Sequence, residues 1–180
     1  MKYIALLRGI NVGGKNLIKM TDLKACFTTL GFKDAVTYIQ SGNVLFDSEI
    51  LDVSLLTTLI EKRLSEEFQY ESKIVLVAHE QYNHIVTHIP KNFGMYGKIY
   101  RYNVLFLRPS LIAKDVVKGI SKKEGVDEVY AGEGVIYFSN LIERASQSHL
   151  SRIIKQPFYT EVTIRNWNTT LQLFKLLNQD

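Results

Sequence analysis

The order of predicted strands and helices most constrains the fold of this chain, because the same order occurs twice. The first half gives a strand, a helix, two strands joined by a short turn, a second helix and a strand. The same order returns after residue 99, although no residue pattern matches between the halves. The order βαββαβ is typical of the split βαβ, or ferredoxin-like, plait.

In the first half, apolar runs alternate with amphipathic stretches that have helical spacing, and turn residues separate them. Thr21 is expected to cap the first helix and Gly31 to end it. The predicted elements are a strand over 3–7, a helix over 21–30, strands over 36–40 and 44–47, a helix from Asp52 or Ser54 to 68, and a strand over 73–78.

The second half begins after a linking helix over 79–89, which Pro90 stops, and an irregular segment over 91–97. Its predicted elements are a strand over 100–107, a helix over 109–120, strands over 126–130 and 135–139, helix 146–155, strand 159–163 and a final helix over 164–178. The predicted fold is therefore α+β, with ferredoxin-like subdomains over 1–79 and 99–180, a linking helix and loop over 80–98, and a C-terminal helix.

Three predicted strands, over 3–7, 74–77 and 104–107, are apolar on both faces. A strand with two apolar faces needs cover on both sides. We expect that cover to come from the other half, the linking helix, the last helix or a second subunit. This pattern argues against an RNA-recognition domain, which needs exposed aromatic residues on the open face of its sheet.

Composition sets broad limits on function. The 180 residues are 46% hydrophobic and 22% charged, as in ordinary globular proteins, and the net charge of +4 permits a phosphate-rich partner without requiring one. No apolar run approaches the ~20 residues of a membrane span, and the N-terminus has no signal-peptide layout. Cys26 is the only cysteine, which excludes an internal disulfide and favours the cytosol.

A glycine-rich segment, Arg8-Gly9-Ile10-Asn11-Val12-Gly13-Gly14-Lys15-Asn16, directly follows the first predicted strand. Backbone N–H groups in glycine-rich turns can hold an anion, and the arginine and lysine add positive charge. The segment nearly fits the phosphate-loop pattern G-x-x-x-x-G-K-[ST]. It fails at Asn16, where a hydroxyl should meet magnesium, and the following helix is expected to begin near Thr21.

A second polar segment contains Gln40, Ser41 and Asn43 in the turn before the third strand. The first and third strands of such a plait are adjacent and antiparallel, so this turn should lie beside the glycine-rich segment. Their polar side chains would then point into one place. The alternative is a hairpin turn with no ligand, since turns favour these residue types.

A third polar segment, Thr163-Ile164-Arg165-Asn166-Trp167-Asn168-Thr169, opens the last predicted helix. Arg165 and Asn166 at a helix start could help to hold an anion. The preferred explanation is structural, because capping residues are expected at any helix start and the tryptophan would pack in the core.

Other patterns carry less functional weight. Glu80, His84 and His88 are spaced for one helix face, but too few further ligands are available for a metal site, and we predict none. Cys26 falls on an apolar helical stripe and is expected in the core. The interleaved basic and aromatic residues of 96–102 could stack on single-stranded nucleic acid, although strand content explains them more simply.

The glycine-rich segment, the central Tyr38-Ile39-Gln40-Ser41-Gly42-Asn43-Val44 and the late 163–169 segment together resemble one bacterial family, the domain-of-unknown-function family 1697. The resemblance spans nearly the whole chain in three separated and correctly ordered motifs. It implies two α/β plait-like subdomains. It implies no reaction, ligand or cofactor.

The leading hypothesis is a cytoplasmic protein that binds a phosphate-bearing small molecule or nucleic acid. Two alternatives remain open: an enzyme acting on a phosphorylated or nucleotide substrate, with unknown catalytic residues, and a homodimeric interaction protein. The predicted ligand-binding residues are Arg8, Asn11, Gly13, Gly14, Lys15, Gln40, Ser41 and Asn43, with Arg165 and Asn166 as further contributors.

Overall fold

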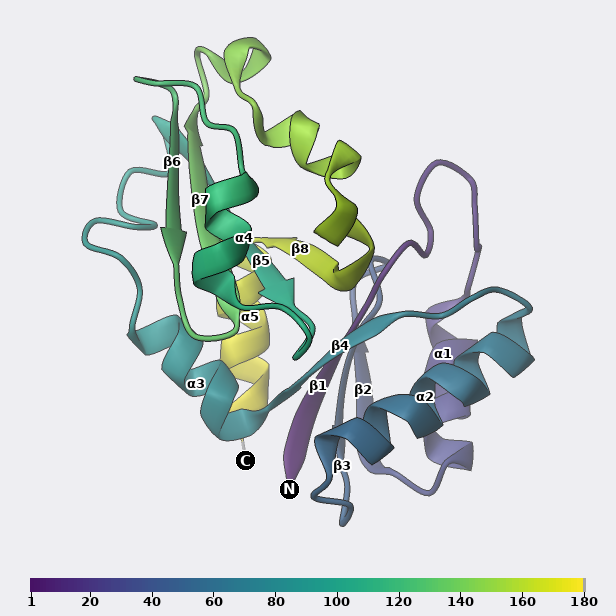
Figure 1. Ribbon diagram of the computed structural model, residues 1–180. Coiled ribbons are helices and arrows are strands. Elements are labelled where there is room, and N and C mark those ends of the chain that lie inside the picture. The colour runs from purple at the N-terminus through teal and green to yellow at the C-terminus, as the bar shows by residue number, and fades with distance from the viewer. Residues whose placement is uncertain (180) are drawn as a thin grey trace. The chain divides into compact units, whose positions relative to one another are not determined.

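The computed structural model describes residues 1–179, which divide into two compact units (Figure 1). Unit 1 comprises Met1–Tyr82 and the end of the chain from Lys175, and unit 2 comprises Asn83–Phe174. Each contains one four-stranded antiparallel sheet. The unit boundaries fall inside two helices, α3 (His79–Thr87) and α5 (Trp167–Leu177).

Unit 1 has the strand order β2-β3-β1-β4, so the first and third strands are adjacent and antiparallel, as predicted. The first-half element order is also confirmed. Its elements are β1 (Lys2–Leu7), α1 (Met20–Thr29), β2 (Lys33–Tyr38), β3 (Asn43–Asp47), α2 (Val53–Phe68) and β4 (Ile74–Ala78).

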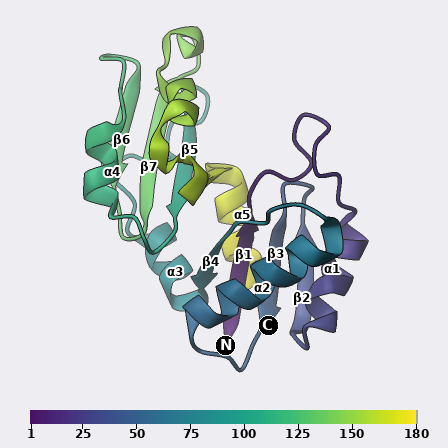
Figure 2. The same cartoon turned by 45° about the vertical axis from the view of Figure 1, so that its right-hand side comes forward.

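The core of unit 1 lies between the sheet and its two helices, α1 and α2, which cover one face (Figure 2). Phe46 is central to this core, with its ring centroid 4.6 Å from that of Phe32 and 5.1 Å from that of Phe27. On the opposite face of β1, Ile4 and Leu6 are also fully buried. Side chains on both faces of this strand are thus buried, as its apolar pattern predicted.

The two helix starts of unit 1 differ. The Asp52 carboxylate accepts hydrogen bonds from the N–H groups of Ser54 (2.9 Å) and Leu55 (3.0 Å), which confirms the start of α2. The predicted Thr21 cap is wrong, because α1 begins at Met20 after Lys19 and has no side-chain cap. Thr21 already lies in the helix, where its hydroxyl contacts the Asp22 carboxylate at 3.2 Å.

Unit 2 has the strand order β6-β7-β5-β8. Its core packs α4 and a run of short 3₁₀ helices against β5 and β7. Its four strands are β5 (Tyr100–Leu107), β6 (Asp127–Ala131), β7 (Val135–Leu141) and β8 (Val162–Asn166). The helix α4 (Ala113–Gly119) lies between β5 and β6 in the chain, and the 3₁₀ helices η1 (Ala145–Gln147), η2 (Leu150–Lys155) and η3 (Pro157–Glu161) lie between β7 and β8.

The helix predicted over 146–155 is wrong, because the 3₁₀ helices η1 and η2 occupy this segment. Side-chain oxygens accept hydrogen bonds from backbone N–H groups of this segment, which an α-helix would otherwise hold. The Asp127 carboxylate accepts from the N–H of His149 at 2.8 Å, and the Ser148 hydroxyl accepts from the N–H of Leu150 at 3.1 Å. Pro157 then opens η3 at a position where its missing N–H costs nothing.

The last strand and helix lie further along the chain than predicted. The expected strand over 159–163 is replaced by η3 and β8, and α5 begins at Trp167. The strand continues through Arg165 because β8 pairs with β5, where Arg165 lies opposite Val104. Two antiparallel sheets with these helices are compatible with two ferredoxin-like subdomains.

Candidate functional site

Gly9–Asn16 form a narrow hairpin between β1 and α1, which we call the glycine hairpin; Figure 1 shows it in purple, extending beyond the end of β1. The N–H of Asn11 donates to the Asn16 carbonyl and the N–H of Lys15 to the Val12 carbonyl, both at 3.1 Å. Gly13 and Gly14 form the tip, with φ of 59° and 74°. A two-residue turn with positive φ at both positions strongly favours glycine or asparagine.

Left-handed backbone is concentrated in this hairpin. Five of its eight residues have positive φ: Gly9, Asn11, Gly13, Gly14 and Asn16. Asparagine tolerates this conformation better than most residues. The Asn16 amide also donates to the Gly9 carbonyl at 2.8 Å, so side-chain hydrogen bonds help to hold the shape of the hairpin.

Asn11 joins the glycine hairpin to the turn before β3. Its amide nitrogen donates to the carbonyls of Ile18 (3.0 Å) and Gln40 (2.9 Å), and its amide oxygen accepts from the N–H of Ile18 (2.8 Å). Two segments that are 29 residues apart therefore meet, as the strand order predicted. The amide of Asn11 stabilises this meeting point, because backbone groups of Ile18 and Gln40 engage both its nitrogen and its oxygen.

The turn itself is packed tightly against the base of the hairpin. The N–H of Leu7 donates to the Gly42 carbonyl at 2.8 Å. A Cβ on Gly42 would lie 2.6 Å from Cδ1 of Ile10, so glycine is needed for this close approach. Asn43 is fully buried, and its amide donates to the Tyr38 carbonyl (2.9 Å) and the Ser41 hydroxyl (3.1 Å). Asn43 therefore shapes the turn from inside.

The groups exposed at this end of unit 1 are fewer than the sequence suggested. Gly13, Gly14, Lys15 and Gln40 are exposed, while Arg8 is half-buried and donates its N–H to the Lys73 carbonyl at 3.0 Å. Within the described part of the chain, no acceptor forms a hydrogen bond with the backbone N–H of Gly13 or of Gly14. The surface thus offers two backbone donors beside a lysine.

Arg165 and Asn166 belong to unit 2, and both are engaged there. Arg165 is buried, and its guanidinium donates to the Ile164 carbonyl at 2.9 Å. The Asn166 amide oxygen accepts from the N–H of Thr169 at 2.8 Å, which caps the start of α5, and the following Trp167 is 8% exposed. These contacts agree with the structural explanation of this segment, which was a capped helix start and a packed tryptophan. Their convergence with the glycine hairpin stays a prediction.

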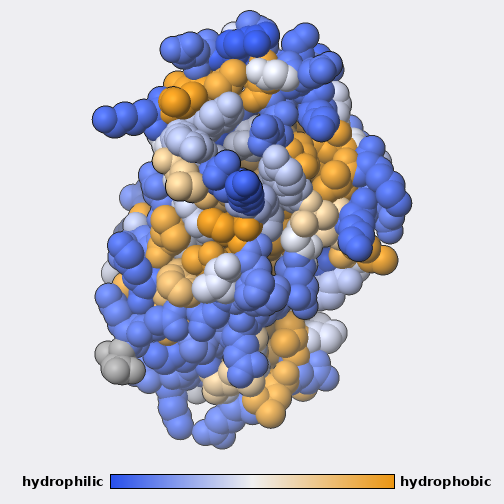
Figure 3. Space-filling model, turned by 90° about the vertical axis from the view of Figure 1, so that its left-hand side faces the viewer, coloured by the Kyte–Doolittle hydropathy of each residue, from blue (hydrophilic) through white to orange (hydrophobic). Residues whose placement is uncertain are grey.

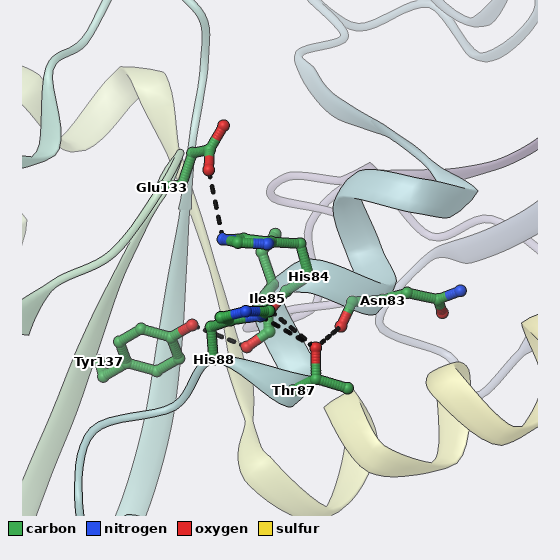
Figure 4. A network of polar contacts seen from close by, with 7 residues as sticks. All are labelled: Asn83, His84, Ile85, Thr87, His88, Glu133 and Tyr137. Carbon is green, nitrogen blue, oxygen red and sulfur yellow. Dashed lines mark hydrogen bonds and ion pairs between the residues drawn. The ribbon is translucent and has the colours of Figure 1, made fainter.

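His84 and His88, which the sequence placed on one face of the linking helix, take part in a polar network within unit 2 (Figure 4). Nε2 of His84 lies 3.2 Å from a carboxylate oxygen of Glu133, and the rings of His84 and His88 stack with centroids 3.9 Å apart. The Tyr137 hydroxyl donates to the Ile85 carbonyl at 2.7 Å. The network ties α3 to the β6–β7 hairpin. Across residues 1–179, no group of three or more His, Cys, Asp and Glu side chains could hold a metal ion.

Cys26 lies in the core of unit 1, where burial raises the pKa of its thiol. A raised pKa lowers the thiolate fraction at neutral pH, and the thiolate is the nucleophile. Cys26 therefore acts as a small core residue, as its position on an apolar helical stripe indicated.

A hollow in unit 2 was missed by sequence reasoning. It has a volume of about 360 Å³, and we call it the tyrosine hollow. The 96–102 run supplies part of its wall, but the sequence did not associate Glu128 and Tyr130 of β6 with that run. The alternation of a strand could have indicated them, since residues two apart share a face. Its lining residues are Lys91, Asn92, Phe93, Tyr96, Tyr100, Tyr102, Glu128, Tyr130 and Ser139.

The fold and these surfaces define an α+β protein of two antiparallel-sheet units with an exposed glycine-rich hairpin. The chain belongs to the family of proteins of unknown function DUF1697, whose model matches residues 1–137. It is similar to the solved structure of the conserved bacterial protein SP0830 from Streptococcus pneumoniae, with 28% sequence identity over 98% of each chain and a TM-score of 0.86. No curated protein matches the chain.

The hydrophobic character of the helices and of the surface bears on which partners the protein can contact. None of the helices within residues 1–179 combines the length and apolar composition that crossing a membrane requires. On the face shown in Figure 3, hydrophobic residues form separate patches between hydrophilic ones. Exposed large apolar side chains of unit 1 include Val12 (66%) and Leu17 (76%), which belong to the glycine hairpin and the segment after it.

Proposed function

We propose that the protein binds a phosphate-bearing ligand at the glycine hairpin. The N–H groups of Gly13 and Gly14 would donate to phosphate oxygens, and Lys15 would neutralise charge. Gln40, exposed on the adjoining turn, would set orientation. Arg8 contributes positive charge from a half-buried position. Asn11 and Asn43 take positioning roles, because their amides bond to the backbone.

The observation that carries this proposal is the clamp made by Asn11. One of its hydrogen bonds joins the hairpin to the 40–43 turn at Gln40, and the other two hold the backbone of Ile18, which follows the hairpin. The left-handed backbone of Asn11 and Asn16 costs free energy that the three glycines of the hairpin do not, and such non-glycine residues are found preferentially at ligand clamps and other functional sites. Preorganised backbone donors bind an anion without a further entropic cost of ordering.

The surroundings of the tip are open to a ligand. A Cβ built on Gly13 or Gly14 would meet no atom within 4 Å, so these glycines are required by backbone conformation rather than by crowding. An exposed hairpin can follow the phosphates of an extended chain as well as those of a small molecule. A nucleoside triphosphatase is not supported, because α1 begins at Met20, five residues after Lys15, and Asn16 supplies no hydroxyl.

Thermal unfolding of the full chain in pyrophosphate tests the proposal. The melting temperature of the parent protein should rise with ligand, since binding to the folded state adds about 2.7 kcal/mol at 100 times the Kd. Lys15→Glu should remove most of the rise. Lys24→Glu, an equal charge change at an exposed position of α1, should retain it.

Two results would contradict the proposal. One is a parent protein that neither pyrophosphate nor a single-stranded oligonucleotide stabilises. The other is an equal rise for the parent and for Lys15→Glu. A Lys24→Glu protein that loses the effect would show that net charge, and not the hairpin, governs binding.

A further inference from the structure

The register of the strands in the unit 2 sheet brings the lining residues of the tyrosine hollow together. Ser139 of β7 lies opposite Tyr102 of β5 on one side and opposite Glu128 of β6 on the other. Directly paired residues of adjacent strands point to the same face. A small serine on the middle strand therefore forms the floor, with larger side chains on both sides.

Aromatic rings form the walls. Tyr100 precedes Tyr102 by two residues and shares its face, and their ring centroids are 6.1 Å apart at an interplanar angle of 39°. Tyr130 stands on the same face of β6, two residues after Glu128, and is 42% exposed. Phe93 packs edge-on against Tyr102 at 4.8 Å, which holds that ring in place.

The doubly apolar strands argued against an RNA-recognition domain, but the tyrosine hollow presents aromatic rings on the unit 2 sheet outside those strand segments. The strand segment over 104–107 is apolar on both faces and buried, as predicted. The tyrosines lie earlier on β5 and on the edge strand β6, beyond that segment. Rings accessible on an antiparallel sheet are the surfaces on which nucleic-acid bases stack in plait-like domains.

Polar groups stand at the edges of the same hollow. The Tyr130 hydroxyl donates to Oε2 of Glu128 at 2.7 Å, which orients the carboxylate. Lys91 and Asn92 line the rim, and the Ser139 hydroxyl lies at the floor. An acceptor, a cation and an amide thus surround flat aromatic surfaces.

We propose that the tyrosine hollow binds a nucleobase. The rings of Tyr100 and Tyr130 stack on the base, and the Glu128 carboxylate accepts from an N–H edge, which guanine presents as two adjacent donors. Lys91 pairs with the attached phosphate. A quaternary ammonium ion also favours aromatic walls and a carboxylate. It has no edge for Ser139 or Asn92, and Lys91 repels it.

The base can come from a free nucleotide or from single-stranded nucleic acid, because both present the same ring and phosphate. Every residue of the hollow lies in unit 2. The inference therefore goes beyond the phosphate site of unit 1 and stands whether or not the glycine hairpin binds.

Calorimetric titration of the full chain with GMP, UMP and ribose 5-phosphate tests the inference, followed by a short single-stranded RNA to distinguish the sources. GMP should bind more tightly than UMP, and ribose 5-phosphate at least tenfold more weakly than GMP. The Tyr100→Ala, Tyr130→Ala double variant should lose about tenfold or more in GMP affinity, as expected for a lost stacking platform.

Three further variants separate stacking from the edge contact. Glu128→Gln should weaken GMP more than UMP, and Glu143→Gln, an exposed glutamate of the same unit, should change neither. Tyr130→Phe keeps the exposed ring and removes only the hydroxyl that contacts Glu128, so it should retain most stacking.

The inference is overturned if ribose 5-phosphate binds as well as GMP, or if neither nucleotides nor the RNA bind. Displacement of GMP by tetramethylammonium at similar concentration would assign the hollow to organic cations instead. A folded double variant that binds GMP with parental affinity would place the base elsewhere.

Discussion

The amide nitrogen of Asn11 lies 2.9 Å from the carbonyl oxygen of Gln40, across 29 residues of sequence. This contact connects the glycine hairpin, in which five residues have left-handed backbone conformations, to the turn before the adjoining strand β3. Because the same amide also contacts both backbone groups of Ile18, one side chain positions three segments. The proposed phosphate site depends on that rigidity.

Replacing Asn11 should destabilise unit 1 and loosen the hairpin. Asn11→Gly keeps the left-handed φ of 52° accessible and removes the side chain with its amide. We expect a loss of about 1–3 kcal/mol in the free energy of unfolding, since three hydrogen bonds are lost. Asn11→Ala should cost more, because alanine adds backbone strain. Urea denaturation of the three proteins measures the difference. A loss below about 0.5 kcal/mol for both variants would contradict the clamp.

Two glycines of this region should respond differently to alanine. Gly13→Ala meets no atom and pays only for its positive φ, about 1 kcal/mol. Gly42→Ala has the same backbone penalty and also places a Cβ 2.8 Å from that of Leu7. Overpacking should add at least about 1 kcal/mol, which thermal or urea unfolding can resolve. Equal losses would show that the turn is not tightly packed on the hairpin base.

Asp127 should be a major stabilising residue of unit 2. It is 4% exposed, and one carboxylate oxygen accepts from the N–H groups of Lys123 and His149, both at 2.8 Å. Asp127→Ala removes two charge-assisted bonds and should cost about 2–4 kcal/mol. Asp115→Ala, which breaks only an exposed ion pair with Lys118, should cost less than about 1 kcal/mol. Similar losses would contradict the bracing role of Asp127.

Tyr137 should make the protein sensitive to alkaline pH. Burial raises the pKa of its hydroxyl to about 12, from an ordinary value near 10. The folded state therefore keeps a proton that the unfolded state releases. The associated stability, on the order of 2–3 kcal/mol, is fully present below pH 10 and is lost as the pH rises to about 12.

Tyr137→Phe, compared with the parent by urea unfolding from pH 8 to pH 12, measures this contribution. The parent should be the more stable protein at pH 8, where its hydroxyl bonds to Ile85, and should lose that advantage above pH 10. Tyr96→Phe, at a ring that is 48% exposed, should follow the parent. A difference that does not change with pH would contradict the assignment.

The first half of the fold was predictable because its signals are local. Apolar runs mark β1 and β4, and the Asp52 cap marks α2. The meeting of the glycine hairpin and the 40–43 turn also followed from strand order. The helix predicted over 146–155 was wrong because the carboxylate of Asp127, about 20 residues earlier in the sequence, accepts a hydrogen bond from the backbone of this segment. No local pattern reveals such a distant carboxylate.

The candidate site was only partly predictable for a related reason. An asparagine in a polar loop looks the same in sequence whether its amide faces a ligand or the backbone. Asn11 and Asn43 proved to be backbone partners, while Gly13, Gly14 and Lys15 remain at the surface. The tyrosine hollow was hidden because its walls come from three segments, and only strand register brings Tyr102 and Glu128 to either side of Ser139.

The backbone amide resonances of Gly13 and Gly14 give the most direct test of the central claim. In a titration of the isotopically labelled full chain with pyrophosphate, these two resonances and that of Lys15 should shift progressively and saturate. Lys15→Glu should abolish the saturation, and Lys24→Glu should preserve it. Unchanged Gly13 and Gly14 resonances at pyrophosphate concentrations that shift other parts of the protein would contradict a phosphate site at the glycine hairpin.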